Sequence, residues 1–289
     1  MRNFIITTDT TCDLPEDYIS KHGLTIIPLA YMIDDVIYDE SNKIPVKDFY
    51  NRMRSGIMPT TMACVPEQVR DIFEGFVKQG FDILHIAFSS ALSCSYNNCV
   101  IVANDIMEDY PDAKISVVDS LSASMGEGLM VHKALKMQEA GASIDEIVAW
   151  IEENKLNFCQ QFTVDDLHHL HRGGRVSKTT AIVGTLINVK PVLHVTDEGK
   201  LHSLSNVRGR KKALNTLVDN MIKNMDGYDG DTSDVFISHG DCLEDAEYVA
   251  ELIRTRLGIQ NITISYISAT IGAHAGPNTV ALFYMGNKR

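Results

Sequence analysis

Several common signatures are absent from this chain of 289 residues, and each absence narrows the range of possible functions. No apolar run approaches the roughly 18 residues that a membrane-spanning helix needs, and the N-terminus carries no signal-peptide pattern. The six cysteines include no CxxC pair, which is typical of buried thiols in a reducing compartment. We therefore expect a cytoplasmic protein without stable membrane insertion.

Motifs for nucleotides and metal ions are missing as well. Neither the P-loop pattern GxxxxGK followed by Ser or Thr nor the dinucleotide pattern GxGxxG occurs, so nucleotide chemistry is expected to belong to a partner. His168, His169 and His171 are close in sequence, but only the first and third share a helix face, and no third ligand is apparent. We predict neither a metal ion nor a cofactor.

Positive charge is scarce, with 26 Lys and Arg residues against 38 Asp and Glu residues and a formal net charge of −12 at pH 7. A negatively charged surface is repelled by nucleic-acid phosphates and by anionic lipid. Nucleic acid is therefore excluded as a general partner.

Short apolar runs alternate with amphipathic segments, which is typical of α/β proteins with a mostly parallel sheet. Ser143 and Glu146 form a capping-box pattern before one of the predicted helices. A tight turn over 196–200 predicts a hairpin, so the later sheet should be mixed. The predicted strands cover 4–7, 25–31, 83–88, 115–118, 162–164, 191–196, 201–207, 235–238, 262–267 and 280–284. The predicted helices after residue 156 cover 179–187, 211–225 and 243–257.

We predict two α/β domains, residues 1–156 with a mostly parallel sheet and residues 157–279 with a mixed sheet. The last strand, within 280–289, could complete either sheet. The segment 89–96 follows a buried strand and opens a helix, with serine hydroxyls at the helix start. Because helix N-termini present unpaired N–H groups and partial positive charge, the segment 89–96 predicts an anion site. This segment contains no Lys or Arg, so we expect one carboxylate or a similar head group.

Five sequence blocks, taken together, resemble the motifs of the DegV family in the same order along the whole chain. The resemblance implies a two-domain α/β protein with one long-chain fatty acid buried in an apolar tunnel between its domains. It also implies that the acid is presented to a separate ATP-dependent fatty acid kinase, which makes acyl phosphate for phospholipid metabolism. The blocks are TDTTCDLP over 8–15, SSALS over 89–93 with Tyr96, DSLSASMG over 119–126, GGRVS over 173–177 and GAHAGP over 272–277.

The resemblance places the fatty-acid carboxylate against Thr61, Ser93 and His274. Without it, helix capping explains Thr61 and Ser93 equally well, and His274 could be an ordinary hydrogen-bonded loop residue. The chain has Cys94 and Ser95 where the family usually has Gly and Thr, so a side chain replaces bare backbone beside the anion site. We include Cys94 in the predicted site because this change could alter chain preference or reactivity.

Basic residues gather in two loops, at Arg175 and at Arg208 and Arg210. The resemblance favours a positive rim that docks an acidic partner or contacts a phosphoryl group. The alternative is a solvated turn and helix start.

The apolar wall of the tunnel is harder to predict, because any candidate could equally belong to the core. A serine hydrolase acting on acyl substrates, with Ser93 as nucleophile and His274 as base, is the alternative function, although no GxSxG elbow is present. The third hypothesis is a kinase in its own right. We favour a carrier without catalytic activity. The candidate wall residues are Ile27, Leu29, Phe88, Met125, Leu129 and Ile187.

Overall fold

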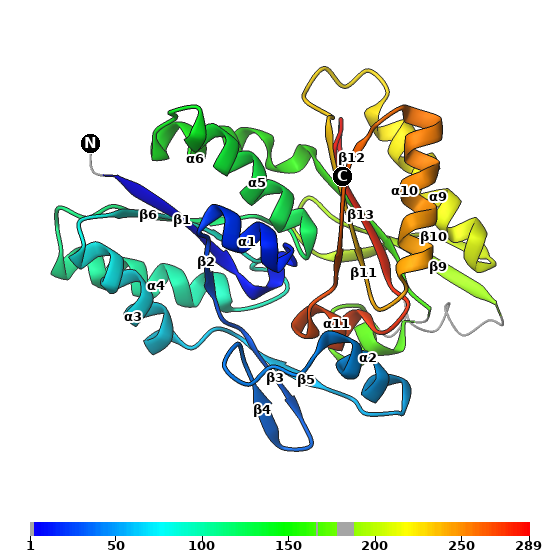
Figure 1. Ribbon diagram of the computed structural model, residues 1–289, viewed down its shortest axis with the longest axis horizontal. Helices are drawn as coiled ribbons and strands as arrows, with labels where there is room; N and C mark the ends of the chain where they lie inside the picture. Colours follow the sequence, from blue (N-terminus) through cyan, green and yellow to red (C-terminus); the bar gives the residue numbers. More distant parts are fainter. Residues whose placement is uncertain (1–2, 166, 178–187) are drawn as a thin grey trace.

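The computed structural model describes residues 3–165, 167–177 and 188–289, and it shows three β-sheets surrounded by helices (Figure 1). The helix predicted over 179–187, with Ile187, lies outside the described residues. Among the residues that are described, no helix has both the length and the apolar character needed to cross a bilayer.

The first sheet has four parallel strands, so the expected parallel sheet is confirmed. Apolar residues on its two faces are buried by two helices each, because side chains alternate along a strand. In sheet order the strands are β2 (Thr25–Ile27), β1 (Phe4–Asp9), β6 (Asp82–Ala87) and β7 (Ile115–Asp119). One face carries α3 (Pro66–Lys78) and α4 (Ser95–Asp109), and the other carries α5 (Met125–Glu139) and α6 (Ile144–Asn154).

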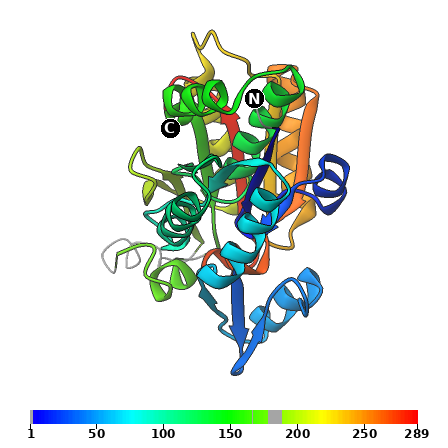
Figure 2. The same cartoon turned by 90° about the vertical axis from the view of Figure 1, so that its left-hand side faces the viewer.

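A small antiparallel sheet interrupts this first half. The strand predicted over 25–31 divides at Pro28, because proline has no N–H to continue the ladder. The chain after Pro28 forms β3 (Ala30–Ile33), which pairs with β4 (Val36–Tyr38) and with β5 (Thr60–Met62). The β3–β4 hairpin projects from the body of the molecule (Figure 2). The remaining helices of this half are α1 (Glu16–His22) and α2 (Val46–Arg54).

The second sheet has six strands and is mixed, as predicted, because only β11 and β12 run parallel. The hairpin at 196–200 joins two antiparallel strands. The last strand lies between β8 and β11, both antiparallel to it, so it completes this sheet and not the first. In order the strands are β10 (Leu201–Arg208), β9 (Val189–Val195), β8 (Phe158–Thr163), β13 (Val280–Met285), β11 (Asp234–His239) and β12 (Asn261–Tyr266). One face packs against α9 (Arg210–Met225) and α10 (Leu243–Leu257), while α7 (His168–Arg172) and the short α11 (Ala269–Ala275) lie at one end.

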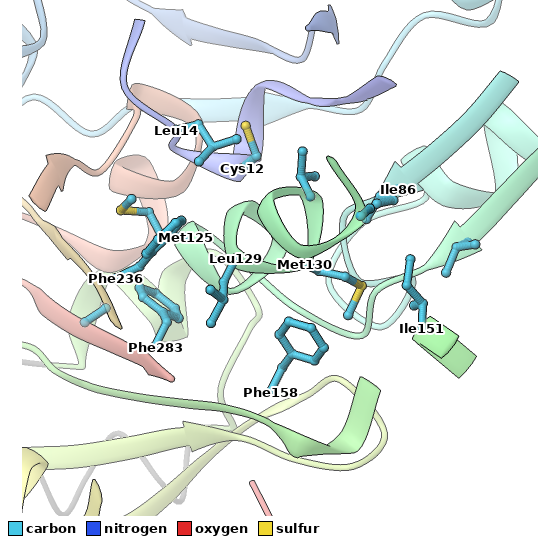
Figure 3. Packing of buried hydrophobic residues seen from close by; sticks show 14 of the residues in the cluster. Cys12, Leu14, Ile86, Met125, Leu129, Met130, Ile151, Phe158, Phe236 and Phe283 are labelled. Carbon is cyan, nitrogen blue, oxygen red and sulfur yellow. The ribbon is translucent and has the colours of Figure 1, made fainter. Parts of the chain in front are cut away.

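Helix α5 packs between the first and second sheets, and the largest hydrophobic cluster contains residues from both. Leu129 and Met130 of this helix lie close to Phe158 and Phe283 of the second sheet (Figure 3). The change of sheet occurs between α6 and β8, but the apolar packing is continuous across it. The domain boundary near residue 156 stays a prediction.

Candidate ligand-binding site

A cavity of about 260 Å³ lies between the two halves of the chain. This volume is near the lower end of the roughly 300–1,000 Å³ that small-molecule sites occupy. Most of the wall is apolar, with contributions from both halves of the molecule. The apolar wall includes Leu29, Phe88 and Leu92 from the first half and Phe162, Val195 and Phe283 from the second.

Two of the six residues proposed for the apolar wall line the cavity, Leu29 and Phe88. Ile27, Met125 and Leu129 instead have no exposed surface and belong to the core clusters. Sequence periodicity cannot separate these two groups, because a cavity wall and a core both require apolar side chains.

Thr61 and His274 form the polar contact at one part of the cavity wall. Thr61 lies on β5, opposite Tyr31 of β3, and His274 lies in the last turn of α11. Their Oγ1 and Nε2 atoms are 2.8 Å apart, within hydrogen-bonding distance. Residues more than 200 positions apart in sequence are therefore joined across the cavity.

The Nδ1 edge of the His274 ring packs against Gly173, and this buried nitrogen has no hydrogen-bond partner in the part of the chain that the structure describes. Any side chain at Gly173 would collide with Nδ1. Burial lowers the pKa of His274 to about 4, and the positive charges of Arg175 and Arg172 act in the same direction. The ring is therefore neutral at pH 7, with one donor and one acceptor nitrogen.

Ser93 and Cys94 line the same cavity at the start of α4. The Ser93 hydroxyl oxygen accepts a hydrogen bond from the Ser95 N–H at 3.2 Å and lies 2.9 Å from the Ser95 hydroxyl. The N-cap residue of α4 is Cys94, so Ser93 is not the helix cap itself but bonds to the first N–H of the helix from the preceding position, while remaining in the cavity wall. The Cys94 side chain is exposed, so this end of the cavity adjoins solvent.

Arg175 belongs to the cavity wall as well, although the sequence placed it on an outer rim. Its Nε and Nη2 atoms donate to the Leu92 carbonyl at 3.2 and 2.8 Å, and Nη1 donates to the Gly173 carbonyl. These bonds attach the loop after α7 to the loop before α4. Arg175 is thus half-buried, and it holds two sides of the cavity together.

The other two arginines of the predicted rim do not line the cavity. Arg210 donates to the Asp245 carboxylate at 2.8 Å and to the Asn278 carbonyl at 2.6 Å, which ties α9 to α10 and to the loop before β13. Arg208 is exposed at the end of β10. The structure therefore gives these arginines three different surroundings.

Polar residues that sequence reasoning missed line another part of the wall, among them Ser124 and Gln160. The Ser124 hydroxyl donates to the Asp13 carboxylate and lies 2.8 Å from the Ser238 hydroxyl. Gln160 is bonded to the Ala123 N–H at 3.1 Å. Ser124 has a positive φ of 54°, which is uncommon for a residue other than glycine. It lies within the 119–126 motif, and this motif was the sequence feature that could have indicated a role for Ser124.

Comparisons with known proteins agree on one family. The family model described as "Uncharacterised protein, DegV family" matches residues 3–287. A DegV domain-containing protein of Clostridium perfringens is 43% identical over 100% of this chain and 99% of its own length. One from Lactococcus lactis is 33% identical over 99% of this chain and 98% of its own.

Solved structures of the same shape are described as fatty-acid-binding proteins. A stearic-acid-binding protein from Eubacterium ventriosum superimposes with a TM-score of 0.91 at 27% identity, covering 98% of both chains. A fatty-acid-binding DegV protein from Thermus thermophilus has a TM-score of 0.87 at 26% identity, covering 99% of this chain and 100% of that one. Sequence motifs, family model, relatives and fold agree, and this chain belongs to the DegV family.

Proposed function

We propose that this protein binds one long-chain fatty acid in the cavity between its halves. The acyl chain lies along the apolar wall, and the carboxylate lies at the end formed by Thr61, Ser93 and His274. The observation that carries the proposal is the Thr61–His274 contact in the wall of a largely apolar cavity. The similarity of this chain to fatty-acid-binding proteins of the same fold supports the choice of ligand.

Most of the affinity comes from the acyl chain. Burying about 14 methylene groups at about 0.8 kcal/mol each gives an upper value of roughly 11 kcal/mol. Hydrogen bonds from hydroxyl or imidazole donors to a carboxylate contribute about 1.5–3 kcal/mol each. The polar end therefore mainly selects the head group and fixes its orientation, and the protein should retain lipid through purification.

The contacts of Ser93 and His274 favour a carrier over a hydrolase. A serine nucleophile needs a base within hydrogen-bonding reach, and the base is usually oriented by a third group. Here the Ser93 hydroxyl is bonded to Ser95 and His274 is bonded to Thr61, while no described residue bonds to Nδ1 of His274 to orient the ring. Labelling of Ser93 by a serine-directed probe would instead favour the hydrolase.

We also propose that the carrier presents the carboxylate of its bound fatty acid to a second protein. The exposed Cys94 marks the part of the cavity wall that adjoins solvent, beside Ser93. A separate ATP-dependent fatty acid kinase would reach the carboxylate there and form the acyl phosphate. Incubating the loaded protein with such a kinase and ATP tests this step, since acyl phosphate should form only when both proteins are present.

Lipid released from freshly purified protein by denaturation identifies the ligand by mass spectrometry. We expect about one long-chain fatty acid per chain, in keeping with one largely apolar cavity between the two halves. Protein that carries no fatty acid and takes none up after delipidation would contradict the proposal.

Ser93→Ala should weaken fatty-acid binding on the order of tenfold, because one donor to the carboxylate is lost. The measurement is a fluorescent fatty-acid displacement titration, with circular dichroism to confirm folding. Ser233→Ala, at an exposed serine far from the cavity lining, is the matched control. Unchanged affinity in Ser93→Ala would remove this residue from the site.

A further inference from the structure

Four side chains that the fatty-acid site does not use come together inside the first half. Asp9 ends β1, His85 lies on β6, Cys99 lies on α4, and Cys64 follows β5. Ligand atoms of Asp9, His85 and Cys99 all lie within 4.8 Å of one another, and these residues are fully buried. The Cys64 sulfur is 3.9 Å from that of Cys99.

Two polar atoms in this cluster have no hydrogen-bond partner among the described residues. They are Oδ1 of Asp9 and Nε2 of His85, which face each other at 3.5 Å. The second polar atom of each residue is already held, since Oδ2 of Asp9 accepts from the Phe88 N–H at 2.7 Å and Nδ1 of His85 lies 3.0 Å from the Thr7 hydroxyl. Metal-binding histidines and carboxylates are typically oriented in this way, with the atom away from the ion fixed by a hydrogen bond.

Two of the separations between the proposed ligand atoms are close to those around a tetrahedral ion. Zinc lies about 2.3 Å from sulfur and about 2.0–2.1 Å from nitrogen or oxygen, so the edges of its tetrahedron are about 3.8 Å between sulfurs and about 3.3 Å between lighter atoms. The two observed separations, 3.9 Å between the sulfurs of Cys64 and Cys99 and 3.5 Å between Asp9 and His85, differ little from these edges.

Charge also favours a cation at this place. Asp9 is fully buried. A buried carboxylate is costly unless it is paired or bound to a metal. The ion-pair partner of Asp9 is His85, whose Nε2 atom lies 3.5 Å from Oδ1.

We propose that Asp9, His85 and Cys99 bind a structural zinc ion, and that the Cys64 sulfur, which is 3.9 Å from that of Cys99 but outside this close group of three, moves in as the fourth ligand. A donor set of one oxygen, one nitrogen and two sulfurs suits tetrahedral zinc better than the octahedral, all-oxygen sites of magnesium or calcium. Binding would release the two thiol protons to solvent. Because the cluster is fully enclosed, the ion is taken up during folding.

Such an ion would support the fatty-acid site from beneath. Cys64 directly follows Met62 and Ala63, which line the cavity, and Asp9 is bonded to the backbone of Phe88, another wall residue. The zinc would join β5 to the strand ends of the first sheet.

Metal analysis of untagged protein tests the proposal directly. Protein purified without chelators should contain about one zinc per chain, retained on dialysis against a chelator and released to a chelating dye only in denaturant. Refolding with cobalt in place of zinc should give the visible bands of a tetrahedral cobalt–thiolate site. Wild-type protein that stays free of zinc and shows no cobalt bands after refolding would overturn the proposal, as would a Cys64–Cys99 disulfide in freshly purified protein.

Variants identify the ligands. Cys99→Ala and His85→Asn should each reduce bound zinc at least tenfold, in line with the loss of one ligand. Cys94→Ser, which removes the exposed thiol, and Cys242→Ala are controls that should retain the full zinc content. Zinc that disappears with Cys94→Ser and persists in Cys99→Ala would show surface binding and overturn the assignment. Fatty-acid content, measured on the wild-type, Cys99→Ala, His85→Asn and Cys242→Ala samples, reports separately on the proposed function.

Discussion

At the scale of single residues, His274 combines three properties that a bare sequence motif does not reveal. It is buried, it is bonded to Thr61 at 2.8 Å, and it is close enough to Arg172 and Arg175 to be affected by their charge. All three follow from the position of α11 against the loop after α7. A neutral imidazole becomes charged more readily when an anion such as the proposed carboxylate binds beside it.

The pKa of His274 predicts a pH-dependent stability in the lipid-free protein. Its folded-state pKa of about 4 is below the ordinary value of 6.5, so the unfolded chain binds the proton more readily. The contribution of His274 to the free energy of unfolding should therefore fall as the pH drops from about 6.5 towards 4, by up to about 3 kcal/mol. Urea denaturation of delipidated protein measures this fall, and His274→Gln should flatten it. Equal pH slopes in the two proteins would contradict the prediction.

At the scale of elements, the packing of α7 and its following turn against α11 positions the polar end of the cavity. Gly173 has an ordinary φ of −72°, so alanine would fit its backbone, but the added methyl group would collide with the His274 ring. The glycine is required here by close approach and not by backbone conformation.

Gly173→Ala should displace His274 and break its bond to Thr61. We expect fatty-acid affinity to fall on the order of tenfold, since about one hydrogen bond to the head group is lost. Gly75→Ala, in α3 with open space around it, is the matched control and should leave affinity unchanged. Displacement titration measures both, and normal affinity in Gly173→Ala would show that the ring position is not essential.

Arg210 illustrates how a basic loop can have a structural role. Its guanidinium group joins α9 to α10 through Asp245 and to the chain before β13 through Asn278. Arg210→Ala should lower the free energy of unfolding by about 1–3 kcal/mol, because it breaks a partly buried network of hydrogen bonds. Fatty-acid binding should be retained.

Arg208→Ala is the comparison, because Arg208 is exposed and should tolerate the change. Chemical denaturation separates the two variants. If Arg208 contacts the proposed kinase, its loss should slow acyl-phosphate formation without altering stability. Full stability in Arg210→Ala would contradict the role we assign to its contacts.

At the scale of the whole molecule, the two sheets share one hydrophobic cluster through α5. The C-terminal Arg289 adds a polar link, since it donates to the Lys155 carbonyl at 2.7 Å and to the Ser120 carbonyl at 3.2 Å. Neither half can separate without exposing apolar surface from both. The cavity is therefore enclosed by a single packed unit.

This continuity predicts one cooperative unfolding transition. Calorimetry should give equal calorimetric and van't Hoff enthalpies, and bound fatty acid should raise the Tm of that one transition. Two separate transitions, with only one sensitive to fatty acid, would show that the halves unfold independently.

Local patterns were sufficient for many of the elements and for the family. The Ser143–Glu146 capping box, the 243–257 helix and the hairpin at 196–200 depend on neighbours within a few residues, and these predictions are confirmed. The polar residues Thr61, Ser93, Cys94 and His274 share one cavity, while their binding of a carboxylate stays a proposal.

Contacts between distant residues required the folded chain. Three features depend on which apolar faces pack together. Strand β13 pairs within the second sheet, and Arg175 lines the cavity. Asp9, His85 and Cys99 lie close to one another. Periodicity shows that a face is apolar but not which other face will cover it, because the hydrophobic effect has no direction. Partner choice is settled only when all the elements pack at once.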